Sequence, residues 1–162
     1  MSNLIVNAFI EIPTGSQNKY KFDKERNVFL LDRVLFSPMH YPSEYGYLEG
    51  TLAPDGDELD ILVITSFPTF PGVVIESRVI GALIMTDHKG KDEKLLAVPT
   101  NDPHFKDVTS LNDIPEHKLK EIEHFFQVYK DLESKKTIID GWEDAEAAKK
   151  IYEACVERFN AK

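Results

Sequence analysis

The sequence has a single cysteine, Cys155, among its 162 residues. One thiol cannot form an intrachain disulfide, and a zinc site of the usual cysteine-based kind needs several, so both features are excluded. No run approaches the roughly 20 consecutive apolar residues of a membrane-spanning helix, and the first residues lack the basic and apolar segments of a secretion signal. These absences predict a cytoplasmic protein without a membrane partner.

Basic residues are also scarce, because 19 Lys and Arg stand against 28 Asp and Glu and give a formal net charge of −9. A surface of this sign repels nucleic-acid backbones and anionic lipids at long range, so nucleic acid is not an expected partner. The chain is long enough for one hydrophobic core and too short for two. With 42% apolar and 29% charged residues, we expect 1–162 to form a single globular domain.

Several familiar catalytic motifs are missing from the sequence. It contains no glycine-rich loop ending in Lys-Ser or Lys-Thr, no Gly-x-Ser-x-Gly and no His-Glu-x-x-His. Nucleoside triphosphatases, esterases and zinc peptidases of those kinds therefore lose support. His117 and His124 lie on one predicted helix without a recognisable third ligand, and we interpret them as surface or packing residues.

Short β-rich segments broken by turn residues occupy positions 4–99. They are LIVNAFIEIP, NVFLLDRVLF, YGYLEGTL, ELDILVITS, VVIESRVIGALIM and KLLAVP. Apolar residues at helical spacing follow, first behind Pro115 and again after a break at Asp140-Gly141. Strands followed by helices predict an α+β domain, in which helices cover one side of an antiparallel barrel or curled sheet.

Three aspartates crowd the entrance to one predicted strand, in the segment DGDELDI that begins at Asp55. Magnesium prefers hard oxygen ligands, and the short carboxylates of Asp55, Asp57 and Asp60 are spaced closely enough to converge. The segment is not an EF-hand, because the glycine and glutamate required at the sixth and twelfth loop positions are absent. A solvated Asp-Gly turn is the alternative that the segment alone leaves open.

A second acidic turn, at positions 86–94, joins two predicted strands and contains Asp87 and Asp92. By itself it is an ordinary charged hairpin. If barrel closure places it beside the first turn, the carboxylates form a cluster that only bound cations could neutralise. Two acidic turns of this kind make a metal site plausible.

Cations for an anionic substrate recur at strand positions, namely Lys19, Lys21, Arg33 and Lys94. Arg33 is the most suggestive, because it interrupts an apolar run where a guanidinium can hold phosphate through two hydrogen bonds. Solvated or structural roles are the alternative for each of these residues.

Tyrosines gather around a Pro and Gly turn at Tyr41, Tyr45 and Tyr47, where they could pack a barrel corner or present hydroxyl groups to a ligand. We favour packing for Tyr41 and Tyr47. Tyr129 and Lys130 lie near the end of the first predicted helix, where a lysine also complements the helix dipole and needs no ligand.

With these residues in view, the sequence resembles the soluble family I inorganic pyrophosphatases of bacterial type, from Phe9 to the C-terminal helix. The aspartate triplet matches the family signature. Other matching blocks, in the family's order, are Glu11 in IEIP, Lys19-Tyr20, Asp32-Arg33, Tyr41-Pro42, Tyr45-Gly46-Tyr47, Met85-Thr86-Asp87, Asp92, Lys94, His124-Phe125-Phe126 and Tyr129-Lys130-Asp131-Leu132.

The resemblance implies an OB-like five-stranded antiparallel β-barrel flanked by two C-terminal helices, and a homohexamer. It also implies hydrolysis of inorganic pyrophosphate to two orthophosphates by direct attack of a metal-activated water, with no phosphoenzyme. Several Mg²⁺ ions would serve each site, and Mn²⁺ or Zn²⁺ could substitute. Carried over by position, the metal ligands are Asp55, Asp60, Asp87 and Asp92, and the catalytic base is Asp57. The substrate-binding residues are Lys19, Arg33, Tyr45, Lys94, Tyr129 and Lys130, with Glu11 and Tyr41 lining the site.

Two positions depart from the family pattern. Lys21 stands where the family usually has glutamate, and His88 stands where many bacterial members carry another acid. Lys21 removes a rim carboxylate and adds a positive charge near the phosphates. We therefore expect metal affinity and product release to differ from those of other family members.

Two other functions use similar features. An OB-like barrel can bind oligonucleotides through basic grooves and stacking aromatics, although the net charge here has the opposite sign. A metal-dependent nucleotide phosphatase would share the phosphate chemistry, but it needs a base-binding pocket that the sequence does not reveal.

Overall fold

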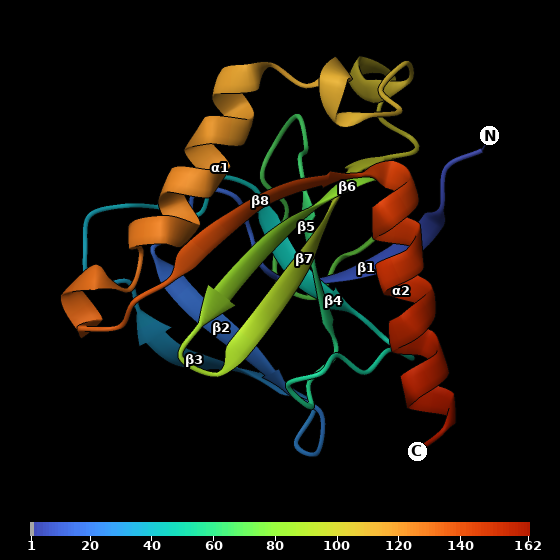
Figure 1. Cartoon of the computed structure of the whole chain (residues 1–162). Coiled ribbons are helices and arrows are strands. Elements are labelled where there is room, and N and C mark those ends of the chain that lie inside the picture. Colours follow the sequence, from blue (N-terminus) through green and yellow to red (C-terminus); the bar gives the residue numbers. More distant parts are fainter. Residues whose placement is uncertain (1) are drawn as a thin grey trace.

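The computed structural model describes residues 2–162 (Figure 1). Its strands are β1 (Ile5–Ile12), β2 (Asn18–Asp23), β3 (Val28–Val34), β4 (Glu44–Leu48), β5 (Leu59–Val63), β6 (Val74–Asp87), β7 (Gly90–Pro99) and β8 (Ile138–Asp144). Its α-helices are α1 (Glu116–Val128) and α2 (Ala145–Asn160), and short 3-10 turns are η1 (Pro103–Phe105), η2 (Leu111–Asp113) and η3 (Asp131–Glu133). Within this range, no helix is long and apolar enough to cross a bilayer.

Five strands close into a ring in the order β1-β4-β5-β7-β6, with β6 returning to pair with β1. The predicted α+β class and OB-like five-stranded barrel are therefore confirmed. The prediction of wholly antiparallel pairing is wrong in one place, because β5 and β7 run parallel. In the sheet, β7 lies between β5 and β6. The chain reverses direction after β5 and again after β6, so β7 runs in the same direction as β5.

Alternating burial shows why β1 belongs to the barrel wall. Val6, Ala8 and Ile10 are buried, whereas the exposed Ile5 and Asn7 point the other way. β1 contacts β4 closely at Gly46, where a Cβ atom would stand 1.9 Å from the Phe9 carbonyl oxygen. A residue without a side chain is thus required where β4 pairs with β1 in the ring.

The prediction of a break at Asp140-Gly141 is wrong, because both residues lie inside β8. Gly141 has φ +133°, and the register with β6 shifts between Ile84 and Met85. The glycine marks an irregularity within a strand rather than its end. The second helix then begins as expected, with the Asp144 side chain accepting a hydrogen bond from the Ala147 backbone N–H.

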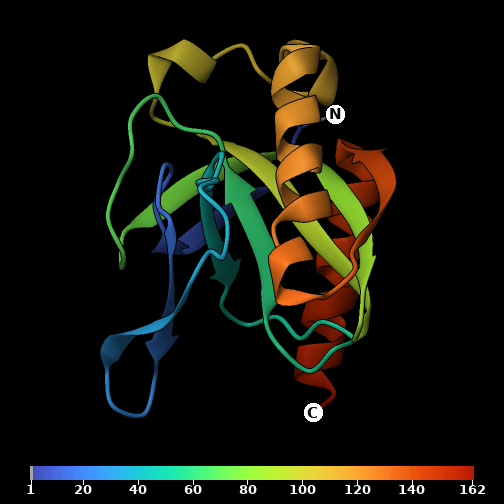
Figure 2. The same cartoon turned by 90° about the vertical axis from the view of Figure 1, so that its left-hand side faces the viewer.

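The two helices cover different sides of the barrel (Figures 1 and 2). α1 buries Ile122, Phe125 and Phe126 in one apolar cluster, and α2 buries Ala148 and Cys155 in a second. Both clusters also include residues of the ring strands, so the two helices stabilise the barrel by packing against it on two sides. The loops that carry the acidic turns lie outside these packed sides.

Strands β2 and β3 form a separate two-stranded sheet, which projects beside the barrel (Figure 2). Aromatic packing attaches it, because Phe22 and Phe29 contact Phe9 with ring centroids 5.2 and 6.1 Å away, respectively. The Phe22 backbone N–H also donates to a Glu11 carboxylate oxygen at 2.9 Å. The hairpin is therefore held mainly by side chains.

Candidate active site

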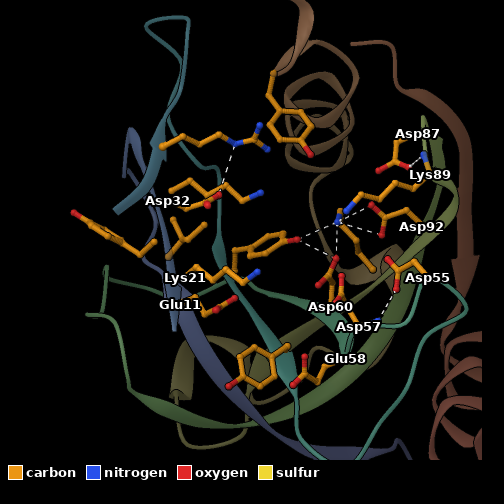
Figure 3. A pocket seen from close by; sticks show the side chains of 18 of the residues that line it. Glu11, Lys21, Asp32, Asp55, Asp57, Glu58, Asp60, Asp87, Lys89 and Asp92 are labelled. Carbon is orange, nitrogen blue, oxygen red and sulfur yellow. Dashed lines mark hydrogen bonds and ion pairs between the residues drawn. The ribbon is translucent and has the colours of Figure 1, made fainter. Parts of the chain in front are cut away.

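A cavity of about 560 Å³ opens between the β2–β3 hairpin, the entrance to β5, the β6–β7 turn and the segment after α1 (Figure 3). Its lining includes every predicted site residue except Tyr41: Glu11, Lys19, Arg33, Tyr45, Asp55, Asp57, Asp60, Asp87, Asp92, Lys94, Tyr129 and Lys130. Both positions that depart from the family pattern, Lys21 and His88, line it as well.

The first acidic turn is an Asp-Gly turn whose carboxylates also reach the cavity. The Gly56 N–H donates to the Ala53 carbonyl at 3.0 Å, and the Asp57 N–H donates to Asp55 Oδ1 at 3.0 Å. Gly56 supplies the left-handed φ of +93° that the turn needs. The two readings left open by the sequence are thus compatible, because the turn geometry presents the aspartates.

The second acidic turn lies on the same cavity (Figure 3). Asp87 pairs with Gly90 across the β6–β7 hairpin, and Asp87 Oδ1 accepts a hydrogen bond of 2.8 Å from the Lys89 backbone N–H. Asp92 is opposite Met85 in the same hairpin. Barrel closure therefore brings the two acidic turns to one cavity, which is the condition for a carboxylate cluster.

Lys94 is a resident cation among these carboxylates. Its ammonium lies 2.8 Å from Asp60 Oδ2 and 3.2 Å from Asp92 Oδ2, and it donates to the Tyr45 hydroxyl oxygen at 3.2 Å. The Tyr45 hydroxyl donates in turn to Asp60 at 2.9 Å. The expectation that only bound cations could neutralise the cluster is therefore wrong, because Lys94 balances part of its charge.

Burial and neighbouring negative charge shift the pKa of Lys94 in opposite directions. Lys94 is only 2% exposed, and burial alone would lower its pKa. Attraction by Asp60, Tyr45 and Asp92 outweighs that effect and holds the Lys94 pKa well above its ordinary value. Burial also raises the pKa of Asp92, although Lys94 opposes the shift. Lys94 thus keeps its charge in a largely water-free position.

A group of cations faces the aspartates from the hairpin and from the end of α1. Lys19 and Arg33 are register partners across β2 and β3, and Arg33 donates to the Glu133 carboxylate. Burial lowers the Lys19 pKa to about 8, with Arg33 and Lys130 adding repulsion. Burial and Arg33 likewise lower the Lys130 pKa. A bound anion would relieve this repulsion, which makes the group suitable for phosphate.

Glu11 occupies the hairpin side of the cavity. Burial raises its pKa to about 7, and nearby Asp60 and Glu58 add to the shift, whereas its hydrogen bond from Phe22 opposes it. Near neutral pH the carboxyl therefore carries a proton part of the time.

Tyr41 and Tyr47 each depart from one expectation. The resemblance implied that Tyr41 lines the site, which is wrong, whereas the interpretation as a packing residue is confirmed: Tyr41 is 1% exposed and lies in the core between Tyr45 and Phe125, with ring centroids 5.7 and 4.8 Å away. Tyr47 was expected only to pack, yet it also lines the cavity, and its hydroxyl has no hydrogen-bond partner among residues 2–162. The alternation of β4 could have revealed this, because Tyr45 and Tyr47 are two residues apart on one strand.

Other charged residues reach the cavity without having been proposed for the site. They are Lys24, Asp32, Glu58, Lys89 and Lys135. Glu58 could have been found from its place inside the aspartate segment. Lys24 and Lys135 carry no local signal, because the tertiary arrangement of the hairpin and the segment after α1 brings them there.

The cavity's possible metal ligands suit a hard divalent cation, since most are carboxylate oxygens and the others are mainly tyrosine hydroxyls. Within residues 2–162, no three His, Cys, Asp or Glu side chains converge closely enough to enclose an ion by themselves. Mg²⁺ commonly binds through one or two carboxylates and completes its shell with water and substrate phosphate. The arrangement therefore fits Mg²⁺ better than a metal that requires a closed protein cage.

Known proteins resemble this chain along nearly its whole length. The inorganic pyrophosphatase of Halalkalibacterium halodurans is 66% identical over 155 residues, which are 96% of this chain and 95% of that protein. The inorganic pyrophosphatase of Geobacillus stearothermophilus is 64% identical over 158 residues, covering 98% of this chain and 96% of that protein.

Solved structures agree with the sequence comparison. The crystal structure of the Thermus thermophilus inorganic pyrophosphatase superposes with a TM-score of 0.94 at 43% identity, covering 96% of this chain and 91% of that chain. The Coxiella burnetii inorganic pyrophosphatase gives 0.93 at 44% identity, with 98% and 97% covered. Since the family model for inorganic pyrophosphatase also matches residues 8–160, this chain belongs to the inorganic pyrophosphatase family.

Proposed function

We propose that this protein hydrolyses inorganic pyrophosphate to two orthophosphates in a magnesium-dependent reaction. The observation that carries the proposal is a cavity lined by eight Asp and Glu and by eight Lys and Arg. The cavity is therefore formally neutral, whereas the chain as a whole carries −9. Added divalent cations would make it attractive to a small, highly charged anion that the rest of the surface repels.

The four proposed metal ligands are Asp55, Asp60, Asp87 and Asp92, and Mn²⁺ or Zn²⁺ could use the same oxygen atoms. When bound, the ions would neutralise phosphate charge and lower the pKa of a coordinated water.

Asp57 is suited to the role of general base. Its backbone N–H is bound to Asp55, but no hydrogen bond or ion pair engages its carboxylate within residues 2–162. It can therefore accept the proton of an attacking water at a carboxylate oxygen. A base of ordinary strength suffices where the water is already acidified.

The cations hold the substrate in this proposal. Lys19, Arg33 and Lys130 would bind the phosphates from one side and Lys94 from the other. The hydroxyl of the buried Tyr129 would donate a hydrogen bond, and that of Tyr45 would do so by turning from Asp60 to the phosphate. Phosphoryl transfer needs such positioning and charge neutralisation more than covalent help. Water therefore attacks phosphorus directly, and no phosphoenzyme forms.

Release of phosphate from pyrophosphate, measured with and without Mg²⁺, tests the activity. We expect metal-dependent release that falls at least about 100-fold in Asp57→Asn, because a positioned general base contributes on this scale. Asp107→Asn, which changes an exposed aspartate outside the cavity lining, serves as the control. Absence of release with Mg²⁺, Mn²⁺ or Zn²⁺ would contradict the proposed function.

Two further assays separate the alternatives. Acid quench of turnover with radiolabelled pyrophosphate should leave no phosphate on the protein, and a labelled aspartate would refute direct attack by water. ATP tested beside pyrophosphate distinguishes a nucleotide phosphatase, which would hydrolyse ATP at a comparable rate.

We also propose a cytoplasmic homohexamer. Exposed apolar side chains such as Phe67, Phe70 and Ile138, at 75%, 68% and 61% exposure, support association of copies of the chain. The one thiol, Cys155, is buried and free, which suits a reducing compartment. Light scattering at several protein concentrations tests the assembly, and a constant monomer mass would contradict it.

A further inference from the structure

The cavity has a glutamate side in addition to the five aspartates of the two acidic turns, Asp55, Asp57, Asp60, Asp87 and Asp92; a sixth, Asp32, lies on the hairpin. Glu11 comes from β1, and Glu58 precedes β5; both line the cavity and are labelled in Figure 3. The Tyr47 hydroxyl, buried and without a hydrogen-bond partner in residues 2–162, lines the same cavity. Two carboxylates and a hydroxyl are oxygen donors of the kind that bind a divalent cation.

Two lysines already occupy this side. The Lys24 ammonium pairs with the Glu58 carboxylate and lies 5.0 Å from the centre of the Tyr47 ring. Lys21 lies beside Glu11 in Figure 3, and its ammonium makes no ion pair with any residue in 2–162. Lys21 is two residues after Lys19 on β2, so both side chains emerge on the cavity face of the hairpin.

Charge balance distinguishes this side from the aspartate side. Two ammonium groups match Glu11 and Glu58, so an additional divalent ion here would meet the repulsion of Lys21 and Lys24 at short range. Among the five aspartates of the two acidic turns, in contrast, Lys94 is the cation in contact, and it pairs with Asp60 and Asp92. Excess negative charge, and with it the attraction for divalent ions, is therefore concentrated on the aspartate side.

We propose that Lys21 is a substrate-binding residue that takes the place of a divalent ion on the glutamate side of the cavity. Its ammonium contacts a phosphate group directly, and divalent ions bind only on the aspartate side. An ammonium on a flexible chain needs no coordination shell to be rebuilt when product leaves, unlike Mg²⁺, which dehydrates reluctantly. This inference rests on the proposed pyrophosphatase function.

Counting bound metal ions tests the exchange of a lysine for a metal. Mn²⁺ is titrated into the protein with saturating orthophosphate, and free Mn²⁺ is followed by electron paramagnetic resonance. Lys21→Glu should bind one more Mn²⁺ per chain than the native protein, because Glu11 and Glu58 then gain a third carboxylate. Lys135→Glu, the same charge change at another lysine lining the cavity, should leave the number unchanged.

An equal count in native protein and Lys21→Glu would overturn the proposal. A gain of equal size in Lys135→Glu would overturn it too, because the effect would then be one of total charge. Circular dichroism and thermal unfolding of each variant establish that the fold is intact, and Lys21→Gln provides a second, more conservative variant.

Kinetics of Lys21→Gln test the direct contact. We expect KM for pyrophosphate to rise about tenfold, as for the loss of one charge-assisted hydrogen bond, with kcat changed less than about threefold. Raising Mg²⁺ should not restore KM, since no metal site has been added. An unchanged KM contradicts the contact. If the native protein releases no phosphate at all, the proposed function fails, whereas the Mn²⁺ count still decides the role of Lys21.

Discussion

Asp60 on β5 and Lys94 on β7 are direct register partners in a parallel pairing, with the Lys94 ammonium 2.8 Å from an Asp60 carboxylate oxygen. Partners in a ladder present their side chains on the same face of the sheet. The parallel arrangement of these two strands thus sets the central ion pair of the site, and a change in register by one residue would separate it.

Removing this cation should destabilise the protein most when metal is absent. Without divalent ions, Lys94→Met should lower the free energy of unfolding by about 3–5 kcal/mol, because Asp60 and Asp92 lose a buried partner. Mg²⁺ should restore part of the loss by supplying positive charge. Urea unfolding in EDTA and in Mg²⁺ measures both. Lys91→Met, at an exposed lysine 3.9 Å from Glu93, should change stability by less than about 1 kcal/mol; equal losses in the two variants would contradict this account.

Glu11 should make the metal-free protein less stable as pH rises. Its pKa is about 7 in the fold against an ordinary value of 4.5, so the folded state binds its proton more tightly. That contribution is fully present below about pH 4.5 and is lost as pH rises through about 7. Glu11→Gln should therefore exceed the native stability at about pH 8 by on the order of 2 kcal/mol, with the difference vanishing near pH 4. Urea unfolding in EDTA across this range measures it, and a pH-independent difference would argue against burial of the charge.

Substrate affinity should decline in alkali through Lys19. Burial lowers its pKa to about 8, so the ammonium loses its proton above that pH. KM for pyrophosphate should rise several-fold between about pH 8 and 9.5 in the native protein and less in Lys19→Arg, because a guanidinium stays charged. Substrate ionisation is common to both proteins and cancels in the comparison. Parallel KM profiles would exclude Lys19 as the titrating group.

Barrel closure should depend on Gly46. A Cβ at this position would meet the Phe9 carbonyl oxygen at 1.9 Å, and backbone cannot move aside as a side chain can. Gly46→Ala should therefore lower the free energy of unfolding by about 3 kcal/mol or more. Gly50→Ala is the matched control, since Gly50 has φ +77° with nothing within 4 Å and should lose only about 1 kcal/mol from strain. Thermal unfolding of both variants tests this, and similar losses would show that steric contact at Gly46 is unimportant.

Most of the barrel and both helices could be predicted from sequence, because each element carries its own apolar period. Val6, Ala8 and Ile10 show the period of two, and Ile122 and Phe126 show helical spacing. Strand β8 could not be predicted, since Asp-Gly is typical of a turn and only pairing with β6 holds it extended. The direction of β5 relative to β7 depends on long-range order, which no local pattern contains.

The site was predictable only where its residues are close together in the sequence. Asp55, Asp57 and Asp60 share one turn, so their proximity follows from sequence distance. Lys19 and Lys130 are far apart along the chain and could be joined only by the family resemblance; the structure then places both on the cavity. The resident charge of Lys94 between Asp60 and Asp92 was not foreseen, because its position depends on the parallel register.

The separate β2–β3 hairpin has a consequence for how this protein can change over evolution. It carries Lys19, Lys21 and Arg33, whereas the aspartates belong to the barrel, and the backbone ladders of the two sheets are independent. A substitution on the cavity face of the hairpin can change the contacts made to a bound anion. It leaves the hydrogen-bonded strands of the barrel, which carry the aspartates, undisturbed. Lys21 is an example: it lies on the hairpin, so a change of charge there leaves the pairing of β5 with β7, and with it the contact between Asp60 and Lys94, untouched.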